Sequence, residues 1–242
     1  MLGSSQSIAG PNIALNTIMA EELGQFADIL ENAEDFDSAL QSLICKTLTE
    51  HSRIIFNGNG YSDEWKQEAE RRGLSNLSST ALALPTYISQ KNIDLVTKHN
   101  IFTESEFRAR HQIHMQSYVK HIRIEAKTTV DMVLHQILPA AVRYSSDLAQ
   151  SALRKQELSV AAKFEKDIVK RISACADELY VKCEDLAKAL KQIPANDDDA
   201  VVYCWDVLVS SMESIRKDAD LLEKLTDKSY WPYPIYSDIL YY

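Results

Sequence analysis

Glycine and proline are scarce in this chain, which has six of each among its 242 residues. Six glycines amount to about 2.5% of the chain, against a usual share of about 7%. Folds rich in hairpins, and phosphate-binding loops built on glycine, have little material here, whereas a mostly helical protein has enough. Long apolar runs are missing too, since no stretch reaches the roughly 18 residues that a membrane-spanning helix needs.

The chain also lacks the marks of secretion. Its first residues contain neither the basic segment nor the apolar core of a signal peptide. The four cysteines form no C-x-x-C pair, and each sits among helix-forming residues: Cys45, Cys175, Cys183 and Cys204. We interpret them as small hydrophobic residues buried in the fold, and a reducing, cytoplasmic location fits best.

Basic residues are outnumbered: 26 lysines and arginines against 35 aspartates and glutamates give a net charge of −9. An acidic surface repels phosphate backbones, so we expect no nucleic-acid partner, and the missing apolar runs argue against a membrane. Apolar residues at 45% and charged residues at 25% are ordinary for a globular protein, so a chain of this length can bury a core.

Residues 1–101 are predicted to contain short helices separated by many breaks. Small polar residues up to Gly10 predict a loop, and stretch 74–85, rich in serine and threonine, looks irregular. Helices are expected from Asn12 and Phe36, and two shorter ones after the capping residues Ser62 and Ser89, the first of them ended by Gly73. A segment of this kind rarely forms a compact domain alone, so it is predicted to be a strap laid over something larger.

Two features of this strap attract attention. Ile54, Ile55 and Phe56 are adjacent, so they cannot share one helix face and must either be buried on several sides or form a short extended piece. The tetrapeptide Asn57–Gly60 follows, and its two Asn-Gly pairs make backbone conformations with positive φ easy to adopt. It is either a tight turn or a loop that approaches a ligand or a neighbouring subunit.

From residue 102 on, long helices are expected. Thr103 and Glu106 have capping-box spacing, and the helical pattern that follows is interrupted at Pro139, where we expect a kink. A second helix has a seam of apolar residues at nearly heptad spacing: Phe164, Ile168, Ile172, Cys175, Leu179, Leu186, Leu190 and Ile193. A third helix follows the acidic run after Pro194, and its apolar residues are Trp205, Leu208, Met212, Ile215, Ala219, Leu222 and Leu225. Short loops make them antiparallel neighbours, so residues 102–227 are predicted to be a three-helix bundle.

The C-terminal tail is aromatic and contains Pro232 and Pro234, so it cannot be helical there. Aromatic side chains bury about 150–250 Å² each when they dock. The tail therefore either wraps back onto its own chain or docks on a partner or sister subunit.

No self-contained active site is visible. The histidines His111, His114, His121 and His135 fall on one predicted helix. The last three are seven or more residues apart, about 10 Å or more along the axis, which is too far to share one ion. His111 and His114 could share an ion, but no other bundle helix has a histidine or a Glu-x-x-His pair to complete a di-iron site. We interpret the carboxylates Glu21, Glu22, Glu68 and Glu70 as parts of solvated helix faces. We therefore assign no catalytic, cofactor-binding or metal-binding residue.

Several long motifs together resemble the C-terminal third of type III glutamine synthetase over essentially the whole chain, most loosely between residues 155 and 228. The matching stretches are residues 3–17, 53–65, 83–89, 124–126, 131–132, 137–140 and 230–234. The resemblance implies ATP-dependent ligation of ammonia to glutamate with Mg²⁺ or Mn²⁺ in a dodecamer built of two rings, the homo-oligomer formed by synthetase subunits. The family's metal, ammonium and glutamate sites lie upstream, so none is carried onto this chain, which we expect to be inactive alone.

The expected fold is therefore mainly α. Residues 1–101, the end of the catalytic domain and a helical strap, would brace a catalytic barrel that the chain lacks, and residues 102–242 would form a long antiparallel three-helix bundle with an aromatic docking tail. Within the enzyme the chain would supply structure and subunit contacts. The alternative is a free-standing helical module that binds a partner, with synthetase subunits as one such partner.

Overall fold

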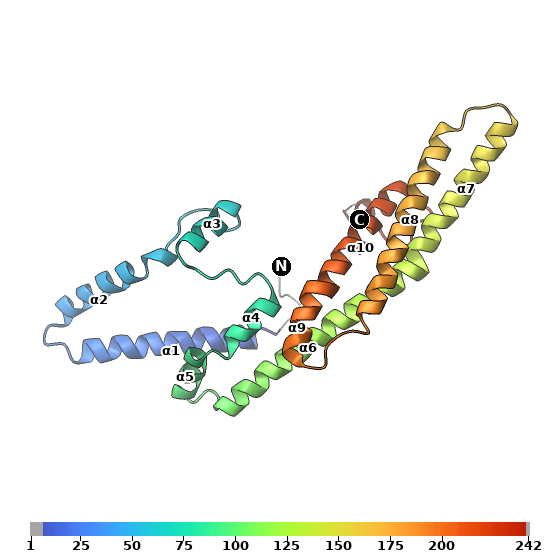
Figure 1. Cartoon of the computed structure of the whole chain (residues 1–242). Helices are drawn as coiled ribbons and strands as arrows, with labels where there is room; N and C mark the ends of the chain where they lie inside the picture. The colour runs from blue at the N-terminus through green and yellow to red at the C-terminus, as the bar shows by residue number, and fades with distance from the viewer. Residues whose placement is uncertain (1–6, 241–242) are drawn as a thin grey trace. The chain divides into compact units, whose positions relative to one another are not determined.

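The computed structural model describes residues 7–240, except for the side chains of Tyr236 and Ser237. The chain is mainly α-helical, as predicted, and the described residues contain no strand. None of the helices among them is long and apolar enough to cross a membrane. The chain divides into two units, Met1–His111 and Gln112–Tyr242, which we describe one at a time (Figure 1).

Unit 1 consists of short helices joined by loops. They are α1 (Ala9–Glu31), α2 (Phe36–Glu50), a 3₁₀ turn (Ser52–Ile54), α3 (Asp63–Arg71), α4 (Thr80–Tyr87), α5 (Gln90–Lys98) and the start of α6. Helix α1 begins three residues earlier than expected and takes Pro11 into its first turn, where a missing N–H costs nothing. The part of the predicted N-terminal loop at residues 1–6 lies outside the described residues.

The stretch 74–85 was expected to be irregular, and this expectation is wrong for its second half. Helix α4 begins at Thr80, and the Ser79 hydroxyl accepts a hydrogen bond from the backbone N–H of Leu82. One of the hydroxyl residues that suggested a loop is therefore the N-cap of a helix, which is a favoured place for serine.

Helix ends follow recognisable local chemistry. At the start of α6, Thr103 and Glu106 form the predicted capping box: each side chain bonds the other's backbone N–H, at 3.3 and 2.9 Å. Gly73 ends α3 with a φ of +69°, and the N–H of Leu74 reaches back to the carbonyl of Ala69. This Schellman arrangement recurs after α5 and α7 with other residues in the left-handed conformation, Asn100 and Ser159.

A small aromatic core lies at the end of unit 1. Ile93, Val96 and Phe107 are buried together, and the ring of Tyr87 stacks on that of Phe107 with centroids 4.4 Å apart. The apolar residues of α5 thus meet the first turns of α6. This cluster is far smaller than the core of unit 2.

Unit 2 contains the long helices. They are α6 (Glu104–Met132, which begins in unit 1), a π-helical turn η2 (Val133–Ile137), α7 (Leu138–Glu157), α8 (Lys163–Ala189), α9 (Asp197–Tyr203), a second π-helical turn η3 (Cys204–Val209), α10 (Ser210–Leu225) and α11 (Tyr236–Leu240). Helix α8 packs along both α7 and α10 (Figure 1).

The interruption expected at Pro139 takes the form of the π-helical turn η2. Pro139 has no N–H to offer and its ring crowds the preceding turn, so the ladder is locally widened just before it. The N–H of Leu138 bonds the carbonyl of Val133, five residues back. The second π turn, η3, has no proline in it or next to it, and the sequence pattern did not predict it.

The core of unit 2 is built by the predicted seam of α8. Leu179, Leu186 and Ile172 are almost fully buried and meet Leu208 and Leu222 of the last helical stretch. Phe164 is the exception, with 63% of its surface exposed, because it stands in the first turn of α8. Three of the four cysteines, Cys175, Cys183 and Cys204, are buried as expected, whereas Cys45 is exposed on α2, so that part of the prediction is wrong.

The described part of the tail packs on its own unit. Trp231 and Tyr233 lie against the core of unit 2, and the Tyr233 hydroxyl donates to Gln136 Oε1 at 2.8 Å. The Tyr230 hydroxyl donates to Asp147, and its ring lies 5.3 Å from that of Tyr144. Of the two alternatives for residues 230–235, wrapping back onto the chain is the one observed.

Candidate functional site

The most unusual surface of the chain lies on α1 and α2. Thr17 is the one buried residue of α1, and α2, all of whose residues are described, has none. Large apolar side chains stand exposed instead: Ile13, Leu15, Ile18, Met19, Leu23 and Ile29 on α1, and Phe36, Ile44 and Leu48 on α2. Isolated apolar side chains at a surface need no explanation, whereas many of them on two helices that contact each other are typical of a surface that a partner covers, which makes α1 and α2 a candidate interaction surface.

A carboxylate fastens α1 to α5. Glu21 Oε1 lies 2.7 Å from Lys98 Nζ, and Glu21 Oε2 lies 2.8 Å from His99 Nε2. The hydrogen bond from Lys98, with smaller contributions from Gln25 and His99, lowers the pKa of Glu21 from 4.5 to about 2. The interpretation of Glu21 as part of a solvated face is therefore wrong, because only 17% of its side chain is exposed. Its neighbour Glu22 is exposed, as expected.

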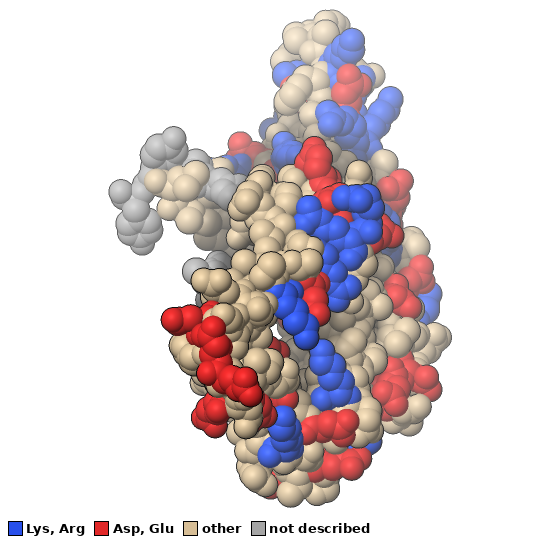
Figure 2. Space-filling view, turned by 90° about the vertical axis from the view of Figure 1, so that its left-hand side faces the viewer, with Lys and Arg blue, Asp and Glu red and all other residues tan. Residues whose placement is uncertain are grey.

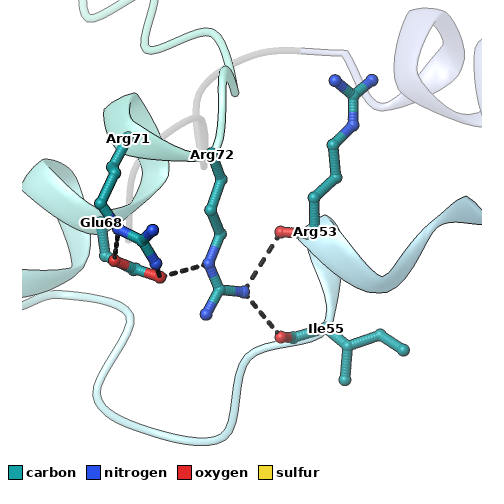
Figure 3. A network of polar contacts seen from close by, with 5 residues as sticks. All are labelled: Arg53, Ile55, Glu68, Arg71 and Arg72. Carbon is teal, nitrogen blue, oxygen red and sulfur yellow. Dashed lines mark hydrogen bonds and ion pairs between the residues drawn. The ribbon is translucent and has the colours of Figure 1, made fainter. Parts of the chain in front are cut away.

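A second polar network holds the segment before the Asn-Gly tetrapeptide (Figure 3). Arg72, at the end of α3, donates from one Nη to the carbonyls of Arg53 and Ile55, at 3.2 and 2.9 Å. Its Nε donates to Glu68, which also takes two hydrogen bonds from Arg71. These contacts lower the pKa of Glu68 to about 2. The Glu68 side chain is 26% exposed and pairs with both arginines, so its interpretation as part of a solvated face is also wrong. Glu70 is exposed, as expected.

This network shows how the apolar triplet is arranged. Ile54 and Ile55 are 60% and 49% exposed, so burial on several sides is not observed, and Ile55 has the extended backbone of the other alternative. The role of Arg72 was not expected from the sequence, although Arg72 and Glu68 have the four-residue spacing that is usual for helical ion pairs.

The Asn57–Gly60 tetrapeptide is a loop, and Gly58 serves a different purpose in it from the one expected. Among the described glycines, positive φ occurs at Gly73 and not in this loop. Gly58 lies against the ring of Phe56, which stacks on Trp65 with centroids 4.0 Å apart. The glycine is therefore used for close approach and not for a left-handed turn.

The four histidines have separate surroundings. His111 is buried, and its Nε2 donates to the Leu84 carbonyl at 3.0 Å. His114 and His121 are exposed, and His135 faces Asp131 across 3.6 Å. Within residues 7–240, no three His, Cys, Asp or Glu side chains come together as a metal site would require.

The divalent cation that the resemblance implies for a whole enzyme does not fit the two carboxylates of this region whose pKa values are most strongly lowered. Glu21 and Glu68 are the carboxylates with the most strongly lowered pKa, and each is already paired with two basic side chains. Mg²⁺ and Mn²⁺ prefer oxygen ligands, and cationic side chains this close would oppose them.

The buried thiols are suited to packing and not to chemistry. Burial raises the pKa of Cys183 to about 11, and it also raises the pKa values of Cys175 and Cys204. A thiol held in its neutral form is a poor nucleophile. The geometry therefore offers an interaction surface and fixed polar anchors.

Comparison with known proteins gives the family. A family model described as the glutamine synthetase C-terminal domain matches residues 39–156. The type-3 glutamine synthetase of Dictyostelium discoideum is 32% identical over 251 aligned positions, which cover 99% of this chain and 34% of that protein. Glutamine synthetases of Bacteroides fragilis and Butyrivibrio fibrisolvens are each 30% identical, covering 99% and 87% of this chain and 34% and 31% of their own lengths.

The chain belongs to the glutamine synthetase family. It corresponds to the C-terminal part of these proteins and spans about a third of their length. The resemblance stated from the sequence motifs is thereby confirmed.

Proposed function

We propose that this chain is the C-terminal region of a type 3 glutamine synthetase and that it supplies structure and subunit contacts to that enzyme. The whole enzyme would ligate ammonia to glutamate at the expense of ATP. Support comes from the match of nearly the whole chain to the C-terminal third of a type-3 glutamine synthetase and of a protein named glutamine synthetase. The reacting groups, ATP and Mg²⁺ or Mn²⁺ would be bound by the part of the enzyme that precedes this region.

One observation carries the structural role: α1 and α2 together have a single buried residue, Thr17. Helices in proteins owe most of their stability to tertiary packing of an apolar face, and an isolated helix as short as α2, with 15 residues, is marginal in water. The apolar side chains of α1 would therefore be covered in the assembled enzyme. We propose that residues 1–101 brace the catalytic barrel with this surface.

The second role falls to unit 2. Its long helices share one core, and the aromatic tail closes over that core. We propose that residues 102–242 form an antiparallel three-helix bundle that contributes to contacts between synthetase subunits in a cytoplasmic homo-oligomer, a dodecamer in the family.

Two experiments test the proposal. The isolated chain should show neither γ-glutamyl transfer nor micromolar binding of Mg-ATP by calorimetry. Produced together with the upstream two-thirds of a type-3 enzyme, it should co-purify with that part and restore activity. Leu15→Asp and Leu23→Asp on α1 should abolish co-purification, whereas Ile124→Asp in unit 2, at a comparably exposed residue, should not. Activity of the isolated chain would overturn the proposal.

A free-standing helical module remains the second candidate. It is favoured by the core of unit 2, where Leu179, Leu208 and Leu222 are fully buried without any other chain. The DNA upstream of Met1 distinguishes the two: an open frame encoding the barrel supports the enzyme region, and a promoter with a ribosome-binding site directly before Met1 supports the module.

A further inference from the structure

The turn between α1 and α2, residues 28–37, combines strong negative charge with exposed apolar groups. We call it the acidic turn. It has five carboxylates and neither lysine nor arginine, and all five carboxylate residues are exposed: Asp28, Glu31, Glu34, Asp35 and Asp37. Ile29 and Phe36 stand exposed among them, at 47% and 55%. Figure 2 looks from the side on which this turn lies and shows acidic side chains gathered in the lower part of that face.

The opposite combination occurs in unit 2. Residues 153–171, where α7 turns into α8, have six basic and three acidic residues in a chain whose net charge is −9. One of the acids, Glu165, is buried and paired with Lys155. A groove of about 460 Å³ begins here and runs between α8 and α10. We call it the α8–α10 groove.

The walls of this groove are apolar and its rim is basic. Phe164 and Ile168 of α8 face Leu221 of α10, and Phe164 and Leu221 are 63% and 42% exposed. Arg171 and Lys224 line the same groove and are exposed. The one acid in the lining, Asp227, has its carboxylate engaged by the backbone and hydroxyl of Ser229.

A buried hydroxyl in the lining also lacks a partner. Thr226 is 7% exposed, and its Oγ1 has no hydrogen-bond partner among the described residues. Nearly all buried polar groups in proteins are hydrogen-bonded, so this fully buried hydroxyl is an exception in the wall of the groove.

We propose that the α8–α10 groove binds the acidic turn of a second copy of this chain, with the Phe36 ring between the apolar walls. The flanking carboxylates of the turn then meet Arg171 and Lys224 at the rim. An aromatic ring buried in a pocket with complementary charges around it is the usual form of an energetic centre in a protein interface. The remaining apolar residues of α1, Ile13 to Leu23, stay available for the catalytic part.

Turn and groove are different surfaces, so the contact is heterologous. Such contacts produce a closed ring when the rotation that relates one copy to the next adds up to a full turn, and an open chain of copies when it does not. This inference deepens the proposed assembly role and rests on it. It concerns a contact between copies, which the co-purification experiment with the upstream part does not probe.

The test is sedimentation velocity of the full chain over a range of concentrations at low and high salt. The wild type should associate, and high salt should weaken the association because exposed charges are screened. Phe36→Ser should raise the dissociation constant at least tenfold, and R171E/K224E should do the same. The matched controls are Leu48→Ser, which alters an equally exposed residue of α2, and K120E/K127E, which alters exposed lysines of α6.

Two mixtures sharpen the result. Phe36→Ser retains the groove and R171E/K224E retains the turn, so mixing them should give one-to-one pairs and nothing larger. Adding Glu34→Lys and Asp37→Lys to R171E/K224E in one chain should restore self-association by exchanging the charges. Circular dichroism checks that every variant keeps its helices.

A wild type that stays monomeric at all concentrations would overturn the inference, as would association that Phe36→Ser leaves unchanged. Either result, combined with normal co-purification and activity in the presence of the upstream part, would leave the proposed function standing and remove only the contact between copies.

Discussion

Gly58 lies directly against the ring of Phe56: a Cβ placed on this glycine would come within 2.6 Å of Phe56 Cζ. The ring cannot yield without disturbing its stack on Trp65. The Asn-Gly loop is thus tied to α3 through an aromatic pair, because Trp65 belongs to that helix. A glycine that is needed because a Cβ would clash with a neighbouring ring responds to substitution differently from a glycine that is needed for a positive φ.

We expect Gly58→Ala to destabilise this loop by about 1 kcal/mol, the typical strength of an aromatic pair. Gly60→Ala is the matched control, because nothing lies within 4 Å of a Cβ at that position. Tryptophan fluorescence and the chemical denaturation of unit 1 report the change. Equal effects of the two substitutions would show that the ring of Phe56 does not constrain position 58.

Arg72 should hold the segment at residues 53–55 in a way that lysine cannot replace. Its fork reaches two carbonyls and Glu68 at once, whereas an ammonium group is a single point of charge. We expect Arg72→Lys to cost about 1 kcal/mol locally, a lower figure than for buried charged hydrogen bonds because the side chain is 24% exposed.

Hydrogen exchange of residues 53–61, read by mass spectrometry, measures this opening. Arg71→Lys is the control, since Arg71 also bonds Glu68, whereas the bonds to the two carbonyls come from Arg72. Exchange that is no faster in Arg72→Lys than in Arg71→Lys would contradict the prediction.

The attachment of α1 to α5 should depend on pH. The pKa of Glu21 is lowered from 4.5 to about 2, so its charged form is favoured in the folded state. The resulting stabilisation is fully present above about pH 4.5 and is lost as the pH falls toward 2. A carboxylate-detected NMR titration should place the midpoint of Glu21 near 2. Glu21→Gln should remove this pH dependence, Glu22→Gln should retain it, and a midpoint near 4.5 would refute the prediction.

Helix ends were the most predictable part of the fold, because their chemistry is local. Thr103 with Glu106, Ser62 and Gly73 each act within four residues of their partners, so spacing alone sufficed. The α8 seam was predictable for a related reason: a helix that packs on two others must repeat its apolar residues regularly.

The contacts that the sequence pattern did not predict are those between residues far apart in the chain. Nothing local tells that Glu21 meets Lys98 and His99, which are 77 and 78 residues away. The exposure of Ile54 and Ile55 was missed for the opposite reason, since apolar residues were assumed to find cover within the chain. In a region that corresponds to a third of a longer protein, apolar residues need not be covered by their own segment.

The tail should contribute to docking more than to helix formation. Trp231 is half-buried against the core of unit 2, and Pro232 fixes the next φ near −65°, so the segment loses little entropy when it docks. Truncating a fully buried tryptophan costs about 3–5 kcal/mol. For a half-buried one we expect about 2 kcal/mol from Trp231→Ala, with attachment of residues 229–242 weakened and helix content by circular dichroism almost unchanged.

Loosening the tail should also weaken self-association. Tyr144 both contacts the ring of Tyr230 and lines the α8–α10 groove, so a detached tail leaves one wall of that groove less firmly supported. Limited proteolysis of the tail and sedimentation velocity measure the two effects in one preparation. Trp65→Ala, a tryptophan change in unit 1, is the control and should leave tail cleavage unaltered. If Trp231→Ala changed neither tail cleavage nor the distribution of oligomers, Trp231 would contribute neither to the attachment of the tail nor to self-association, and the prediction would be wrong.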